Sequence, residues 1–153
     1  MSEDWGEFKV GNRVRSQSRT VTEGDFSAIV NISWENGPLH TDEEYMKSTP
    51  FGRRILGGPC LIALIAGLST QPMYAMWRRS SLNCIAGLGI DNVRYTAPFH
   101  PEDTLTVEIE VVELRETRSR PGRLVGRVRD IAFKQDGQTV LEMERTYLLE
   151  RVG

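Results

Sequence analysis

The stretch that decides the fold runs from Pro59 to Leu68 and reads PCLIALIAGL. A helix formed by these residues is apolar on every side, and a helix that is apolar all round must be buried all round. In a domain of this size, only a sheet that curls around the helix can cover it. The apolar run is about half the ~20 residues that a membrane-spanning helix requires. We therefore expect a long buried helix over residues 59–76, inside a curved sheet.

Strands suitable for such a sheet follow the helix. Four stretches alternate apolar and polar residues, as half-buried strands do: 85–96, 105–114, 124–134 and 139–151. Asp136-Gly137 is a typical hairpin turn between the last two. The placement of helices before strands predicts an α+β hotdog fold, in which an antiparallel sheet wraps around a long buried central helix. The four strands are expected to form a meander.

The part of the chain before the buried helix predicts shorter elements. Residues 13–21 predict one strand, and Thr22 predicts the cap of a short helix. A loop is expected over 34–41, because Pro38 disfavours helix in the residue before it. One or two helical turns are expected over 42–48.

Length and composition are those of a single-domain globular protein. The 153 residues fit one domain over 1–153, with 1–10 expected to be an N-terminal tail. Hydrophobic residues make up 39% and charged residues 26%, and the formal net charge of −2 points to neither nucleic acid nor an anionic membrane as a partner. The first ten residues are acidic and lack an apolar core, so we expect no signal peptide and a cytoplasmic protein.

The residues that could hold a metal do not form a cluster in the sequence. Cys60 and Cys84 are isolated in apolar surroundings, without the paired spacing of metal ligands. Of the two histidines, His100 lies in a proline-flanked turn and is expected to be a surface residue. We expect no metal site.

His40 is the histidine whose neighbours in the sequence suggest a role in proton transfer. It follows Pro38 in the predicted loop, five residues after Glu35. A carboxylate and an imidazole on one short loop can share a water molecule, one accepting a proton and the other giving one. Gly57 and Gly58 then open the buried helix, whose free N–H groups and positive dipole end can hold an anionic oxygen. A structural histidine and a plain loop entering a helix remain open as alternatives.

At these residues the sequence resembles a known family. WENGPLH (34–40), FGRRI (51–55) and Gly58 resemble the signature of the MaoC-like acyl-CoA hydratases and dehydratases, which have the hotdog fold. LGIDNVRY (88–95) resembles the strand that follows the central helix in that family. RETRSRP (115–121) resembles the branch of the mesaconyl-CoA and itaconyl-CoA hydratases. The resemblance covers most of the chain.

The sequence also departs from the family's pattern. Four positions differ: Glu35 stands where the family has aspartate, Gly37 where it has asparagine, Gly57 where it has histidine, and Ala66 where it has a supporting serine. His40 and Gly58 match outright. Glu35 keeps the carboxylate but adds a methylene, and a displacement near 1 Å can cost ~10²-fold in rate.

The resemblance implies an enzyme that adds water to a trans-2-enoyl-CoA or removes it from the 3-hydroxyacyl-CoA, with no cofactor beyond the coenzyme A of its substrate. Glu35 would take a proton from water, His40 would orient that water and deliver a proton, and the Gly58 N–H would hold the thioester oxygen. Six further residues are expected to contact substrate: Asn36, Tyr45, Phe51, Arg53, Arg54 and Gly57. Arg53 or Arg54 would bind a CoA phosphate or the carboxylate of a dicarboxylic acyl group. Further candidates are Arg78, Arg79, Arg118, Arg120 and Arg123 for phosphate, and Met73 and Trp77 for the acyl group.

The sequence also leads us to expect a particular oligomeric state and leaves two alternative functions open. Hotdog sheets have exposed edges, so the resemblance implies a homodimer or a larger homo-oligomer. The alternatives are an acyl-CoA thioesterase of the same fold and a non-catalytic acyl-CoA-binding subunit of a heteromeric dehydratase. Thioesterases do not usually carry the PLH loop (38–40), whereas Glu35, Gly37 and Ala66 favour the non-catalytic subunit.

Overall fold

Six strands and five helices form the part of the chain that this computed structural model describes, residues 5–153. In chain order they are β1 (Arg13–Arg15), β2 (Arg19–Thr20), α1 (Glu23–Ser33), α2 (Pro38–Thr41), α3 (Glu43–Lys47), α4 (Gly58–Leu68), α5 (Thr70–Arg79), β3 (Leu82–Tyr95), β4 (Thr104–Glu116), β5 (Arg123–Phe133) and β6 (Thr139–Arg151). Residues 1–4 of the expected tail lie outside the described residues.

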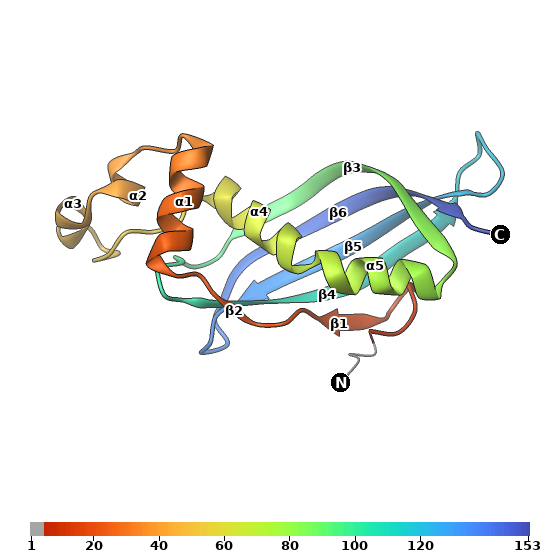
Figure 1. Ribbon diagram of the computed structural model, residues 1–153, viewed down its shortest axis with the longest axis horizontal. Coiled ribbons are helices and arrows are strands. Elements are labelled where there is room, and N and C mark those ends of the chain that lie inside the picture. The colour runs from red at the N-terminus through yellow and green to blue at the C-terminus, as the bar shows by residue number, and fades with distance from the viewer. Residues whose placement is uncertain (1–4) are drawn as a thin grey trace.

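The strands form an antiparallel sheet that curves around α4 and α5 (Figure 1). Its order is β1-β4-β5-β6-β3, and the two-residue strand β2 also pairs with β4. The predicted α+β class, with an antiparallel sheet around a central helix, is confirmed. The expected meander of four strands is wrong in one respect, because β3 pairs with β6 and not with β4. The turn over 96–103 carries the chain across the sheet before β4 begins.

The inner face of the sheet buries the alternate residues that the sequence pattern marked. On β4, Leu105, Val107, Ile109 and Val111 are fully buried, and the residues between them are partly exposed. Burying a side chain of this size stabilises the fold by roughly 1.5–3 kcal/mol. The sheet is therefore a rigid support for the helices and loops that pack against it.

The central helix differs from the prediction in continuity and in burial. It is broken at Ser69 into α4 and α5, which meet at a bend of 41°. Ser69 is fully buried, and its hydroxyl donates to the Ile65 carbonyl at 2.7 Å, which satisfies the polar side chain inside the core. Within the described chain the prediction of all-round burial is wrong, because Ala63 and Gly67 are exposed. Between residues 5 and 153, no single helix is long and apolar enough to cross a membrane, and only α4 and α5 taken together across the bend reach that length and composition.

The N-terminal region is more ordered than expected. Phe8 is only 2% exposed and its ring lies 6.2 Å from the Trp77 ring, so this residue of the expected tail belongs to the core, and Trp5 packs against it. The strand expected over 13–21 is split in two, because the Ser16 hydroxyl accepts the Val107 N–H and interrupts the ladder. The predicted cap of α1 is confirmed: Thr22 and Asp25 form a reciprocal capping box.

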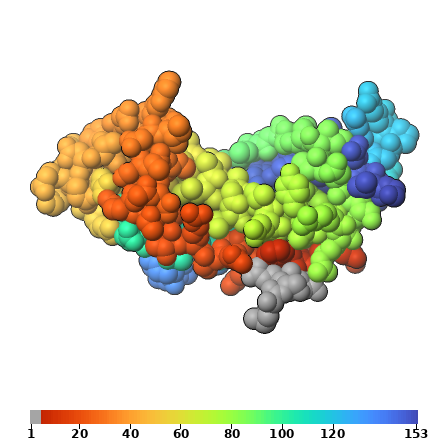
Figure 2. Space-filling view, in the orientation of Figure 1, coloured from red at the N-terminus to blue at the C-terminus, as the bar shows by residue number. Residues whose placement is uncertain are grey.

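Helices α1, α2 and α3 form a cap at one end of the sheet (Figures 1 and 2). The Arg54 guanidinium ties this cap together by pairing with Glu43 at the start of α3 and with Glu23 at the start of α1. It also lies over the Phe26 ring, 5.5 Å from the ring centroid. The hydrogen bonds to Glu43 and Glu23 raise the pKa of Arg54. The cap is thus fastened to the segment that leads into α4.

Candidate active site

A cavity of about 430 Å³ opens between the cap and the first turn of α4. Its walls are mainly apolar and come from residues 55–58, the α4 residue Leu61, residues 95–99 at the end of β3, and Val140 of β6. Five of the residues predicted from the sequence meet in it: Glu35, His40, Phe51, Gly57 and Gly58. A concave, largely apolar pocket with a few convergent polar groups is the usual form of a small-molecule site.

His40 enters the cavity from a helix that the sequence did not predict. Residues Pro38–Thr41 form the single turn α2, so the expected loop over 34–41 is wrong at its end. Pro38 occupies the first helical position, where its missing N–H leaves no helical bond unmade. The His40 Nδ1 atom lies 2.7 Å from the Ile55 carbonyl oxygen. Because a carbonyl can only accept, Nδ1 carries a proton and Nε2 is the atom presented to the cavity.

The backbone of residues 54–56 is held from three sides. Ile55 N–H donates to the Leu39 carbonyl at 3.0 Å, and Leu56 N–H donates to the Phe99 carbonyl at 2.8 Å. His100 Nδ1 lies 2.9 Å from the Arg54 carbonyl. His100 is therefore half-buried and supports the site, in contrast to the surface turn residue expected from its flanking prolines.

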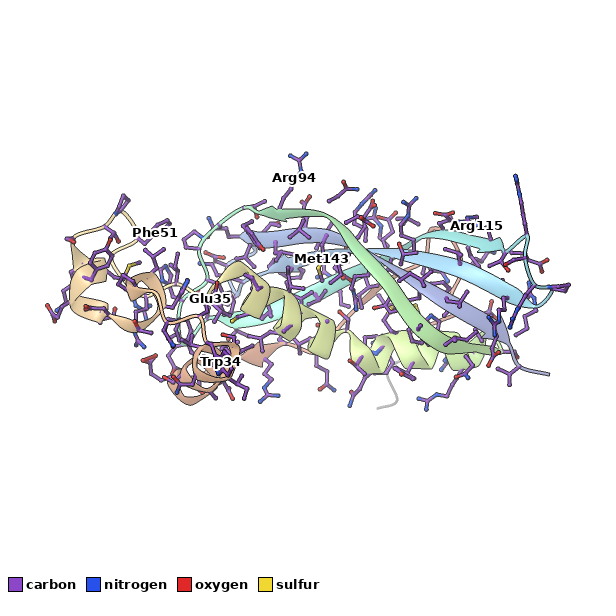
Figure 3. All side chains as sticks on the ribbon, turned by 90° about the horizontal axis from the view of Figure 1, so that it is seen from above. Trp34, Glu35, Phe51, Arg94, Arg115 and Met143 are labelled. Atoms are coloured by element: carbon purple, nitrogen blue, oxygen red, sulfur yellow. The ribbon has the colours of Figure 1, made fainter. Side chains whose placement is uncertain are left out.

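Glu35 reaches the cavity because α1 ends in a left-handed residue. Trp34 has φ 62°, which turns the chain sharply after Ser33 and directs Glu35 toward the first turn of α4 (Figure 3). Glu35 Oε1 lies 4.0 Å from His40 Nε2. A water molecule at ordinary hydrogen-bond distance, about 2.8 Å, can contact both atoms at once. The geometry fits a shared water better than a direct hydrogen bond.

The Glu35 carboxylate lies directly against the backbone of Gly57. A Cβ atom at Gly57 would overlap both carboxylate oxygens of Glu35. The backbone of Gly57 is ordinary, with φ −62° and ψ 143°, so another residue could adopt it. Glycine is required here for space alone, and the longer Glu35 side chain occupies the space that a side chain at 57 would take.

The first turn of α4 presents a free donor to the cavity. Among residues 5–153 the Gly58 N–H makes no hydrogen bond. The Tyr95 ring and hydroxyl lie against the Gly58 Cα, where a Cβ atom would overlap them. An anionic oxygen placed at this turn would meet the Gly58 N–H and the positive end of the helix dipole.

Sequence reasoning missed three groups next to Glu35 and His40. Tyr95 comes from the end of β3, and Cys60 and Ser33 lie beside Glu35, with the Cys60 thiol 3.4 Å from Glu35 Oε2. Cys60 lies two residues after Gly58 in the sequence, which is a usable signal once Gly58 is suspected. No local signal identifies Tyr95, because 37 residues separate it from Gly58.

Four predicted substrate contacts do not line the cavity. Asn36 lies outside its walls, and Tyr45 is 47% exposed on α3. Arg54 is occupied by Glu23 and Glu43 in the cap. Arg53 is exposed and donates one hydrogen bond to the Pro101 carbonyl at 3.2 Å. The hydrogen bond from Arg54 is the main cause of the lowered pKa of Glu43, and the charge of Arg53 contributes to it.

The other candidate contacts lie away from the cavity. Arg78 and Arg79 are in the last turn of α5, and Met73 and Trp77 pack in the core on that helix. The hairpin over 117–122 lies at the opposite end of the sheet from the cap (Figure 1). In the described chain, 5–153, His, Cys, Asp and Glu side chains form no group of three that could hold a metal ion.

The chain is similar to a known protein family and to several characterised proteins. Residues 7–132, which include Glu35 and His40, match the family described as "MaoC like domain". The chain is 25% identical over 146 residues to the beta-methylmalyl-CoA dehydratase of Chloroflexus aurantiacus, covering 95% of this chain and 39% of that protein. It is 29% identical over 111 residues to the (R)-specific enoyl-CoA hydratase of Aeromonas caviae, covering 72% of this chain and 76% of that protein.

Solved structures agree with the fold. A monoamine oxidase regulatory protein from Archaeoglobus superimposes with a TM-score of 0.84 and 29% identity, covering 95% of this chain and 92% of that one. The chain spans less than two fifths of the length of two of the curated relatives that it matches.

Asp103 closes the turn that forms one wall of the cavity. Its carboxylate accepts the His100 N–H and the Gln135 side-chain N–H, each at 2.9 Å, and Lys134 Nζ lies at 3.5 Å. Burial opposes the charge of Asp103, but the hydrogen bonds from Gln135 and His100 and the charge of Lys134 outweigh it. They hold the pKa of this carboxyl below its ordinary value.

We expect Asp103→Asn to lower the free energy of unfolding by about 1–2 kcal/mol at pH 7. Because the folded-state pKa of Asp103 lies below the unfolded one, this contribution is complete above the ordinary carboxyl value of about 3.9. It is lost as the pH falls through the folded-state value. Urea unfolding of both proteins across this range tests the sign, and a difference that stays constant from pH 7 into acid would contradict it.

Proposed function

The chain belongs to the family of MaoC-like domains, and we propose that it adds water to a short trans-2-enoyl-CoA, or removes it from the corresponding 3-hydroxyacyl-CoA. One observation carries the proposal: Glu35 and His40 face each other across 4.0 Å in an apolar cavity, beside the free N–H of Gly58. The relatives named as a dehydratase and a hydratase support this class of reaction. The mesaconyl-CoA branch stays a prediction.

The proposed hydration uses a proton acceptor and a proton donor on opposite sides of one water. The water oxygen forms a bond to C3 while one of its protons passes to Glu35 Oε1. The π electrons of the C2–C3 bond shift toward the thioester, whose oxygen gains negative charge and is stabilised by the Gly58 N–H. His40 acts in this step as an imidazolium, with a proton on Nε2 as well as on Nδ1. The Nε2 proton passes to C2, which completes a neutral 3-hydroxyacyl-CoA, and the proton taken up by Glu35 then returns to His40 Nε2. The hydrogen bond from Nδ1 to the Ile55 carbonyl holds the ring in position throughout.

The lining of the cavity favours an uncharged acyl group. Among the described residues that line it, His40 is the only side chain able to carry a positive charge. A second carboxylate on the acyl group would have no arginine partner there, since Arg54 is held by Glu23 and Glu43. We assign Arg53 to a CoA phosphate outside the cavity, because its side chain is exposed and its one hydrogen bond goes to a backbone carbonyl, that of Pro101.

The function is tested by following enoyl absorbance with crotonyl-, mesaconyl- and itaconyl-CoA. We expect turnover of crotonyl-CoA, lowered about 10²–10⁴-fold by His40→Ala and by Glu35→Gln, because each removes one proton-transfer group. Glu44→Gln is the matched control, since this carboxylate lies on the surface with its side chain 81% exposed. Activity in His40→Ala equal to wild type would refute the assignment.

The same assay separates the alternatives. Release of free CoA without loss of the enoyl group would identify a thioesterase. Binding of crotonyl-CoA by calorimetry with no turnover on any of the three esters would indicate a non-catalytic subunit. Preference for mesaconyl-CoA over crotonyl-CoA would contradict the proposed uncharged acyl group.

The contact between Gly57 and Glu35 gives a second prediction. We expect Gly57→Ala to lower kcat/KM about 10²-fold while the free energy of unfolding changes by less than about 1 kcal/mol, because the flexible carboxylate is displaced before the backbone moves. Gly67→Ala is the control: it lies on the same helix with nothing within 4 Å of the added carbon. Thermal unfolding and steady-state kinetics of both variants test this. Unchanged kinetics in Gly57→Ala would show that the position of Glu35 is unimportant.

We also propose a homodimer through β3. This 14-residue strand pairs with β6 on one side only, and its other edge carries exposed apolar side chains. Ile85, Leu88 and Ile90 are 39%, 54% and 47% exposed. A long apolar strand edge invites pairing with another strand, and antiparallel pairing with a second copy satisfies both edges at once.

Light scattering after gel filtration tests the dimer. The wild type is expected at about twice the chain mass of 17.3 kDa. Leu88→Lys places a charge on the proposed interface and is expected to give a folded monomer, whereas Val10→Lys, equally exposed but on the N-terminal segment, leaves the dimer intact. A monomeric wild type would exclude this interface.

A further inference from the structure

The Cys60 thiol contacts one oxygen of the Glu35 carboxylate, Oε2, whereas His40 approaches the other oxygen, Oε1. Cys60 is in the first turn of α4 and is only 2% exposed. Its sulfur lies 3.4 Å from Glu35 Oε2 and 3.2 Å from the Ser33 hydroxyl oxygen. The Ser33 oxygen in turn lies 3.4 Å from the Glu35 backbone nitrogen. Both ends of Glu35 are therefore in contact with this pair.

The direction of each hydrogen bond follows from counting protons. The Ser33 hydroxyl donates to the Val30 carbonyl at 3.1 Å, so its oxygen acts as an acceptor toward Glu35 N–H and toward the thiol. Burial raises the pKa of the Cys60 thiol, which keeps its single proton at neutral pH. The thiol has three acceptors within reach: the Ser33 hydroxyl oxygen, Glu35 Oε2 and, farther away at 4.0 Å, the Ile29 carbonyl. The charged oxygen of Glu35 is the strongest of the three.

We propose that Cys60 and Ser33 are positioning residues for Glu35: the thiol holds Oε2, so that Oε1 is directed at His40 and the shared water. A glutamate has one more rotatable bond than an aspartate, and its carboxylate needs a fixed partner to keep one orientation. Gly57 provides the space for the carboxylate, and Cys60 provides the hydrogen bond. This inference rests on the proposed function for its kinetic arm only.

The groups that face Glu35 are few and come from separate elements. His40 approaches from α2, Cys60 from α4 and Ser33 from α1, and Tyr95 of β3 lines the same cavity. Of these, Cys60 can be changed with the least effect on the others, because its backbone stays in α4. Serine at 60 keeps a donor, whereas alanine removes it.

The kinetic arm compares Cys60→Ala with Cys60→Ser. We expect Cys60→Ala to lower kcat about 3- to 10-fold with KM unchanged, because orientation of the base matters only in the transition state. Cys60→Ser is expected to restore most of the lost kcat, because it keeps a hydrogen-bond donor at this position. Cys84→Ala is the control, as Cys84 lies outside this cavity.

A second arm needs no turnover. The carboxyl carbon of Glu35, assigned by its absence in Glu35→Gln, is observed by ¹³C NMR at pH 7 in the wild type, Cys60→Ala and Cys60→Ser. We expect its chemical shift to change in Cys60→Ala and to stay near the wild-type value in Cys60→Ser, because only alanine removes the hydrogen-bond donor. A changed shift in a protein that turns over no ester would uphold the positioning role and reject the proposed function. Turnover with unchanged kcat and unchanged chemical shift in a folded Cys60→Ala protein would overturn the positioning role.

Discussion

The hydrogen bond between the His40 ring and the Ile55 carbonyl is the contact on which the site depends. It fixes which ring nitrogen faces the cavity, and it does so only because residues 54–56 are themselves held by Leu39, Phe99 and His100. The Ile55 carbonyl is thus a fixed acceptor on a segment that has no regular secondary structure. Without that support, the imidazole would have no preferred orientation relative to Glu35.

The fold was largely predictable because its signals are periodic. Alternation over β4, β5 and β6 and the apolar run in α4 follow from the burial of one face, which is a local property of the sequence. The break at Ser69 and the pairing of β3 with β6 were not predictable, because a helix bend and a strand order depend on contacts between distant residues. The all-round burial predicted for α4 failed because a single chain leaves part of that helix open.

The candidate site was predictable only where the chain itself brings groups together. Glu35, His40, Gly57 and Gly58 lie within 24 residues, and the loop and helix pattern connected them once the family resemblance was added. Arg54 was expected at the substrate, but two carboxylates from α1 and α3 bind it, and neither lies next to it in sequence. The contributions of Tyr95 and His100 could not be predicted, because the chain brings them back to the cavity only at and after the end of β3.

The overlap between a side chain at 57 and a glutamate at 35 has an evolutionary consequence. An aspartate at 35 is shorter and leaves room that a glutamate fills, so the two positions cannot vary independently. If the carboxylate is to keep the position seen here, a path of single substitutions from aspartate to glutamate at 35 must pass first through glycine at 57. The reverse path must shorten residue 35 before residue 57 can regain a side chain. The order of mutations is thereby constrained by a single van der Waals contact, and a reversion at one position alone is expected to be counterselected.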